Sequence, residues 1–197
     1  MKAIPLSVLI ALPLVAQVSA PVPAPRPAWF PSKSYRADIP LPSAGKAYTR
    51  HTDLVAYASA LAAAAPDRVR LLTLNITEEG RPQPFLVISS PANIAQLEQL
   101  KANNAKLADP RSCPGPEAER IVHDNPVFVW LGYSIHGAEP SGSEASLAVA
   151  YHYAAALDAE VVKQLERVVV LMDLTQNPDG RERAIQSVSE VLQGINP

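Results

Sequence analysis

The sequence predicts an α/β fold with a mixed, partly parallel central sheet, and three observations support this class. Residues 69–76 and 84–89 are β-rich segments around a turn-like stretch, so we expect an antiparallel hairpin. Residues 127–131 and 168–174 are valine-rich runs, typical of central strands covered on both faces. The helical pattern between these runs predicts a right-handed crossover, and therefore a parallel pair.

The first twenty residues are predicted to be a secretory signal peptide. Lys2 precedes an apolar stretch, and the segment ends on Val18-Ser19-Ala20, which suits cleavage after Ala20. A membrane anchor is the alternative, but the stretch is shorter than the roughly 20 apolar residues of a spanning helix. We therefore expect a secreted or periplasmic protein that has no membrane partner once the signal is removed.

The rest of the chain is expected to form a leader and one domain. Residues 21–45 are rich in proline and predict an extended leader that Trp29, Phe30 and Tyr35 pin to the domain. Residues 46–197 are long enough for a single core. Seventeen basic and nineteen acidic residues give a net charge of −2 without a basic block, which argues against nucleic-acid binding.

Helical periodicity predicts three helices. The first spans residues 52–65, and the second begins at Pro91 and ends before Asp109-Pro110. The third follows Ser141, where Ser141 and Glu144 have the spacing of a capping box. Between the second helix and the first central strand we expect a surface loop that carries Cys113.

Two polar loops follow the central strands. His136 and Glu139 come after residues 127–131, and the Asn177-Pro178-Asp179-Gly180 turn comes after residues 168–174. Because parallel strands end at the same sheet edge, we expect both loops to meet where ligands bind in open α/β sheets.

His136 and Glu139 are the candidate metal ligands. Imidazole nitrogen and carboxylate oxygen are both zinc donors, and catalytic zinc sites combine three protein ligands with an open position. Gly137 permits a tight backbone path, and Pro140 disfavours helical geometry at Glu139, so both side chains can turn to one point. A surface ion pair is the simpler alternative.

Arg181 and Arg183 follow the second loop. Either guanidinium is able to bind a substrate carboxylate or a developing oxyanion by charge-assisted hydrogen bonds. A solvated helix start explains them equally well. For His51, His123 and His152 we expect ordinary packing or solvent roles.

Several segments together resemble the zinc carboxypeptidases of the M14 peptidase family. These segments are Glu79-Gly80-Arg81-Pro82, Ile88-Ser89-Ser90-Pro91, residues 130–142 around His136 and Glu139, and Asn177-Pro178-Asp179-Gly180. The resemblance implies a three-layer αβα architecture, one zinc ion held by His136 and Glu139, and a cleft lined by the Asn177 turn. Together with Arg181 and Arg183, which their charge suggests, Asn177 completes the set of candidate substrate-binding residues.

In this family a further His completes the zinc site and a Glu acts as general base, both nearer the carboxyl terminus. Residues 184–197 contain no His and depart from the family pattern. The resemblance therefore implies a chain truncated at its C-terminus, with the third ligand and the base beyond residue 197. Absent strands would also leave the sheet edge beside residues 168–174 unpaired.

The resemblance implies a metallocarboxypeptidase that cleaves carboxy-terminal bonds of peptides or proteins by a metal-activated water. Two alternatives stay open. The same scaffold and metal also suit a zinc amidase or deacylase, because zinc chemistry does not dictate which amide is cut. A non-catalytic remnant or binding module would explain the absent ligand and base.

Overall fold

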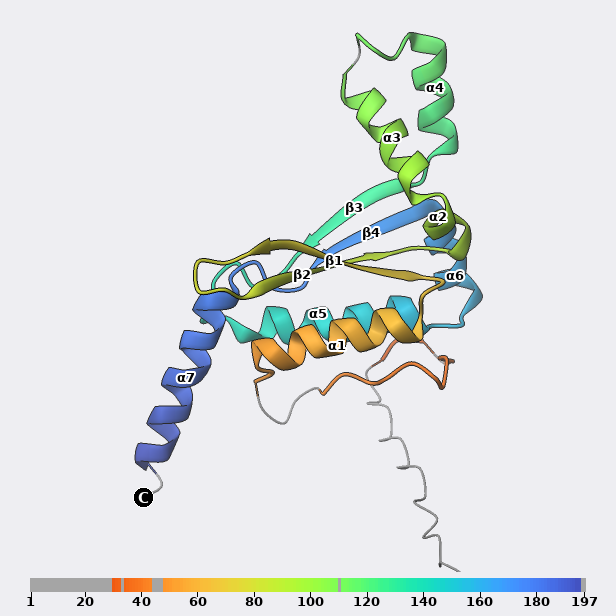
Figure 1. The fold of residues 1–197 in the computed structure, drawn as a ribbon. Helices are drawn as coiled ribbons and strands as arrows, with labels where there is room; N and C mark the ends of the chain where they lie inside the picture. The colour runs from red at the N-terminus through yellow and green to blue at the C-terminus, as the bar shows by residue number, and fades with distance from the viewer. Residues whose placement is uncertain (1–29, 33, 44–47, 110, 196–197) are drawn as a thin grey trace, which may run out of the picture.

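The computed structural model describes residues 30–32, 34–43, 48–109 and 111–195. In this part of the chain a four-stranded sheet has the order β1-β2-β4-β3. The sheet and its helices form layers (Figure 1), which confirms the predicted α/β class with a mixed, partly parallel sheet. The strands are β1 (Val69–Ile76), β2 (Pro82–Ile88), β3 (Val127–Gly132) and β4 (Val168–Asp173).

The strand pairing agrees with the predicted hairpin and crossover. Strands β1 and β2 are antiparallel, and β3 and β4 are parallel in a register that sets Val127 opposite Val168. The expectation of an unpaired edge beside β4 is wrong, because β4 also pairs antiparallel with β2. The outermost strands of this sheet are β1 and β3. The prediction that residues 127–131 form a central strand covered on both faces is therefore wrong: among the described residues no strand pairs beyond β3, and Val127, Val129 and Trp130 are exposed.

Two helices cover one face of the sheet. Helices α1 (His51–Ala64) and α5 (Pro140–Ala155) lie side by side beneath it (Figure 1). The hydrophobic core between them and the sheet includes Leu54, Leu86 and Met172, none with exposed surface. Helix α6 (Ala159–Arg167), which the sequence analysis did not predict, returns the chain to β4 and adds Leu165 to the same core.

The described part of the leader packs against the domain. Phe30 and Tyr35 are buried, and their rings contact the ring of Tyr151 on α5. Tyr35 also forms an isolated bridge with Ala156, at the end of α5. These contacts anchor the leader as predicted. Trp29 and the predicted signal peptide lie outside the described residues.

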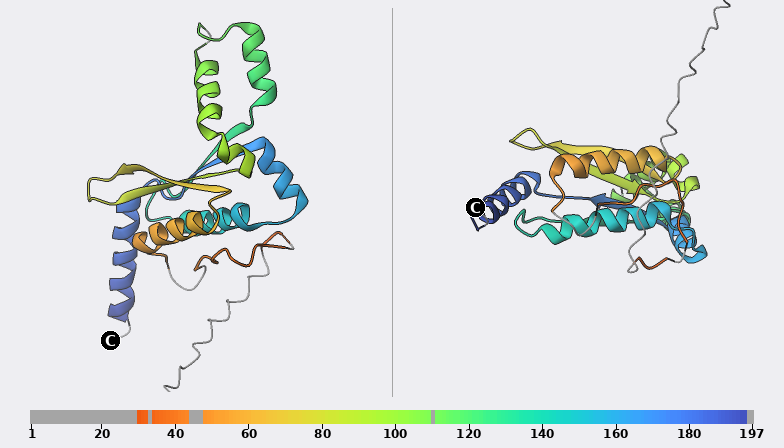
Figure 2. Two further views of the ribbon diagram at one scale, coloured as in Figure 1. Left: turned by 45° about the vertical axis from the view of Figure 1, so that its right-hand side comes forward. Right: turned by 90° about the horizontal axis from the view of Figure 1, so that it is seen from below.

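The opposite face carries a thin helical layer. Helix α2 (Pro91–Ala95) and the start of α3 (Leu97–Ala108) pack there, with α4 (Gly115–Asp124) beside α3 in a hairpin that projects from the sheet (Figures 1 and 2). The predicted single helix is interrupted at Gln96, which has φ −112° and ψ 20°. Cys113 was expected in a surface loop, yet its side chain is buried.

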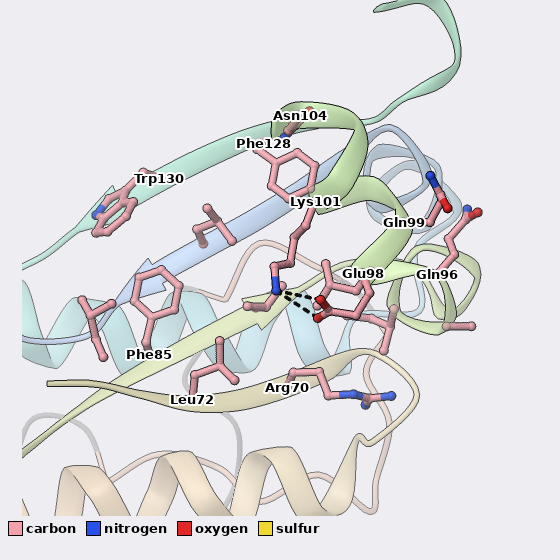
Figure 3. A pocket seen from close by; sticks show the side chains of 16 residues that line it. Arg70, Leu72, Phe85, Gln96, Glu98, Gln99, Lys101, Asn104, Phe128 and Trp130 are labelled. Carbon is pink, nitrogen blue, oxygen red and sulfur yellow. Dashed lines mark hydrogen bonds and ion pairs between the residues drawn. The ribbon is translucent and has the colours of Figure 1, made fainter. Parts of the chain in front are cut away.

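Beyond this layer the second face is open. A hollow of about 840 Å³ lies on it, lined by apolar side chains from all four strands and from α2 and α3 (Figure 3). Leu72 and Trp130 at its border are 51% and 54% exposed. This hollow contains neither His136 nor Glu139, so it is separate from the candidate metal loop.

Helix α7 (Pro178–Ile195) follows β4 and leads away from the sheet to the end of the chain (Figure 1). Its first turn lies beside the β1–β2 turn and the start of α5, as the hydrogen bonds described below establish. Within the described residues, none of the helices combines the length and apolar character that membrane crossing requires.

Candidate metal centre

The two loops after the parallel strands run side by side. The backbone N–H of Tyr133 donates to the carbonyl of Asp173 at 3.1 Å, and the N–H of Gln176 donates to the carbonyl of Tyr133 at 2.9 Å. These bonds continue the β3–β4 pairing past the ends of the strands. The structure therefore brings the predicted metal loop and the Asn177 turn together at one sheet edge.

His136 and Glu139 face each other across a tight turn. The Glu139 N–H donates to the His136 carbonyl at 3.0 Å, and His136 Nδ1 lies 3.5 Å from Glu139 Oε2. Their side chains are 73% and 68% exposed. Ser134 has a φ of 53°, and its hydroxyl donates to the Glu139 carbonyl at 2.9 Å. The loop backbone thus presents both donors to solvent at one place.

Gly137 lies in backbone contact with the start of α7. A Cβ atom added at Gly137 would overlap the carbonyl group of Gly180 and the nitrogen of Arg181. Only a residue without a side chain fits this approach. The sequence predicted that Gly137 allows a tight turn between the two ligands. In the structure the backbone at Gly137 also packs against the start of α7.

Asn177 caps helix α7. Its Oδ1 accepts a hydrogen bond from the N–H of Gly180 at 2.8 Å, and its carbonyl accepts from the N–H of Arg181 at 3.0 Å. Pro178 is the first helical residue, where a missing N–H carries no penalty. The Asn177 side chain therefore caps the start of α7, and its amide oxygen already has a partner.

Asp179 joins the start of α7 to the β1–β2 turn. Its Oδ1 accepts hydrogen bonds from Thr77 Oγ1 and Arg81 Nη1, each at 2.7 Å. Burial acts to raise the pKa of Asp179, but the hydrogen bonds from Arg81 and Thr77 hold that pKa below its ordinary value. The ionised carboxylate thus links the hairpin to the loop region.

Arg181 has no exposed surface. Its Nη2 donates to the Thr49 carbonyl at 2.8 Å, its Nη1 to the Pro140 carbonyl at 3.2 Å, and its Nη2 also pairs with Glu144. Substrate binding by Arg181 stays a prediction, and it would require this buried network to open.

The predicted capping box does not form. Ser141 lies inside α5, whose first residue is Pro140, and the residue before the helix makes no side-chain cap. Glu144 instead accepts hydrogen bonds from the N–H and the hydroxyl of Thr49 at 2.8 and 2.7 Å. Glu144 and Thr49 were not predicted as site residues, because their partners lie far away in the sequence.

Arg183 is the exposed member of the candidate substrate-binding set. Its side chain is 72% exposed and pairs with Glu79. His51 is buried and its Nε2 contacts the Pro82 carbonyl at 2.7 Å, His123 is exposed on α4, and His152 contacts the Tyr35 hydroxyl at 3.1 Å. None of these three histidines joins the metal loop.

Sequence patterns did not identify Asp173, a buried carboxylate near the two loops. Asp173, the last residue of β4, is 2% exposed and its Oδ2 accepts from Gln83 Nε2 at 2.8 Å. Its Oδ1 has no hydrogen-bond partner in the structure, and burial raises the pKa of Asp173. An acidic residue at the end of an apolar strand was the only signal in the sequence.

The donors present fit a zinc site in part. Imidazole nitrogen and carboxylate oxygen within 3.5 Å are the right chemistry, and both are accessible. Among the described residues, however, no group of three possible ligands comes together. His136 and Glu139 thus supply two of the three protein ligands that a catalytic zinc site uses.

A family model described as zinc carboxypeptidase matches residues 54–193. Curated protein sequences gave no significant match. Among solved structures, the crystal structure of thrombin activatable fibrinolysis inhibitor (TAFI) has a TM-score of 0.48 and 13% identity, over 71% of this chain and 28% of that chain.

Bovine thrombin-activatable fibrinolysis inhibitor, solved in complex with tick carboxypeptidase inhibitor, has a TM-score of 0.42 and 14% identity. The match covers 68% of this chain and 33% of that chain. The present chain therefore corresponds to a third or less of these solved chains.

Proposed function

The chain belongs to the zinc carboxypeptidase family, and we propose that its His136–Glu139 loop binds the zinc ion of a metallocarboxypeptidase. The reaction is hydrolysis of the carboxy-terminal bond of a peptide or protein substrate. When bound, zinc activates a water molecule and polarises the scissile carbonyl. The protein is exported after removal of residues 1–20, to a secreted or periplasmic location.

One observation carries this proposal. The two donor side chains are exposed and lie 3.5 Å apart, in a loop whose central Gly137 contacts the Asn177 turn. A chance surface ion pair needs no such backbone contact. The two loops that carry the family motifs are therefore in contact where the proposed zinc site lies.

The proposed substrate contact is Arg183. Its exposed guanidinium lies two residues beyond Arg181, on the helix whose start contacts the metal loop at Gly137, and can exchange Glu79 for a substrate carboxylate. Asn177 and Arg181 are weaker candidates, because their polar groups hold the loops together. The third ligand and the general base are proposed to lie outside this sequence, so the chain alone would bind zinc weakly and without turnover.

Zinc stoichiometry tests the proposal. The purified chain is dialysed against excess zinc and analysed for metal, beside His136→Ala and the control His123→Ala, which changes an exposed histidine on α4. We expect zinc in the wild type and in His123→Ala, and a loss in His136→Ala. Equal zinc in all three proteins would exclude the His136 site. Parallel assays on peptides and acylated amino acids separate carboxypeptidase from amidase activity in any longer form.

A further inference from the structure

We propose that Arg181 is a positioning residue that fixes the metal loop from both sides, an inference that rests on the proposed zinc site. The residue contacts the loop through its own backbone at Gly137 and through its guanidinium at Pro140. These two points flank Glu139, the proposed carboxylate ligand. Arg181 therefore sets the distance between His136 and Glu139 without touching the metal.

The first contact is between backbones. Arg181 N and the carbonyl group of Gly180 fill the space in which a side chain of Gly137 would lie. The Arg181 N–H is used within the helix cap, where it donates to the Asn177 carbonyl at 3.0 Å. The α7 start is thus held by its own cap, and the metal loop rests against a fixed surface.

The second contact is a hydrogen bond. Arg181 Nη1 donates to the carbonyl of Pro140, the residue that follows Glu139, at 3.2 Å. The same guanidinium donates through Nε and Nη2 to the Thr49 carbonyl at 3.2 and 2.8 Å. The planar guanidinium of Arg181 therefore joins the segment before α1 to the start of α5, where the metal loop ends.

Glu144 supplies the opposite charge. It pairs with Arg181 Nη2 and accepts two further hydrogen bonds from Thr49, so its carboxylate is held in place. Because Arg181 has no exposed surface, water cannot replace these partners. The pair is consequently fixed in one geometry, and so is the Pro140 carbonyl bound to it.

A lysine cannot reproduce this arrangement. The planar guanidinium presents five donors in a fork, whereas an ammonium group is a point charge on a flexible stem. Arg181→Lys keeps the charge for Glu144 but is expected to lose the bond to Pro140. Loss of an outer partner that orients a ligand typically weakens metal binding by about 10–100-fold.

The experiment compares Arg181→Lys with Arg68→Lys in the full chain. Arg68 is also a buried arginine, and its Nη1 donates to the Ala156 carbonyl at 2.7 Å, just beyond the far end of α5. Each variant loses a buried guanidinium group, so both are expected to be less stable than the wild type. Only Arg181 contacts the metal loop. The readouts are zinc affinity by competition with a chromophoric chelator, and amide hydrogen exchange of residues 133–142 without metal.

We expect Arg181→Lys to weaken zinc binding at least tenfold and to speed exchange in residues 133–142, and Arg68→Lys to do neither. Wild-type affinity and exchange in Arg181→Lys would overturn the inference, as would equal effects of both variants. If the wild type binds no zinc, the proposed function fails, and the exchange data still decide whether Arg181 fixes the loop.

A milder variant covers the case in which Arg181→Lys does not fold. Glu144→Gln keeps an oxygen acceptor for Thr49 and Arg181 but removes the charge. It is expected to shift exchange and zinc affinity in the same direction and by less. Unchanged exchange in a folded Glu144→Gln would count against the inference.

Discussion

The backbone of Gly180 occupies the space that a side chain at Gly137 would need. This contact joins two loops that follow different strands, and it lies between the proposed ligands His136 and Glu139. At this contact the two loops therefore pack backbone against backbone.

Gly137→Ala should displace the first turn of α7 or the metal loop. The added methyl group overlaps backbone atoms, which cannot rotate away, so we expect a loss of stability on the order of 1–3 kcal/mol and weaker zinc binding. Gly115→Ala is the control, because a Cβ atom there meets nothing within 4 Å. That variant should be neutral or stabilising by up to about 1 kcal/mol. Equal behaviour of the two variants would show that the loops can separate freely.

Asp179→Asn should remove a contribution to stability that depends on pH. The pKa of Asp179 is held below its ordinary value of 3.8 by the hydrogen bonds from Arg81 and Thr77, although burial opposes them. Its stabilising effect is thus present above 3.8 and is lost as the pH falls through the lowered pKa.

Denaturant unfolding of wild type and Asp179→Asn measures this effect. The wild type should be the more stable protein at neutral pH, and the difference should shrink under acid conditions. A difference that does not change with pH would mean that the carboxylate charge contributes nothing.

Asp173→Asn should act in the opposite direction. Burial raises the pKa of Asp173 above its ordinary value of 3.8, so the folded state favours the protonated acid. Stability then falls as the pH rises from 3.8 through the raised pKa. The amide oxygen still accepts from Gln83, so the variant should be at least as stable as the wild type at neutral pH. Thermal unfolding across this pH range checks it, and a less stable variant at neutral pH would show that the buried charge is compensated.

Val127→Lys should slow aggregation of the chain. Val127 is 64% exposed on β3, an edge strand, and a lysine on an edge strand opposes pairing with another chain. Val122→Lys is the matched control, because Val122 is 68% exposed but lies on α4. Light scattering against concentration should show less association for Val127→Lys alone. If both variants associate less, the added charge and not the edge position of β3 explains the effect.

Much of the fold was predictable because its signals are local. The valine content of residues 168–174 reflects the burial of that strand, and the crossover rule then predicted the parallel pair. Residues 69–76 were recognised by their β-forming residues, although most of that strand is exposed. The same rule predicted that His136 and Asn177 would reach one sheet edge. The helix break at Gln96, helix α4 and helix α6 were missed. Helices α4 and α6 have only 10 and 9 residues, and so few turns give a helical period little length over which to be recognised.

The α/β class, the hairpin, the parallel pair and the position of the His136–Glu139 loop beside the Asn177 turn can all be read from the amino-acid sequence, because residue patterns and the order of the strands along the chain encode them. Long-range packing places β4 inside the sheet, pairs Glu144 with Arg181 in place of a cap on α5, and buries Arg181. Thr49 and Arg181 are 132 positions apart, and a hydrogen bond over such a separation leaves no local pattern to read. Residue type and spacing indicate which chemistry a side chain can perform, whereas tertiary packing determines its hydrogen-bond and ion-pair partners.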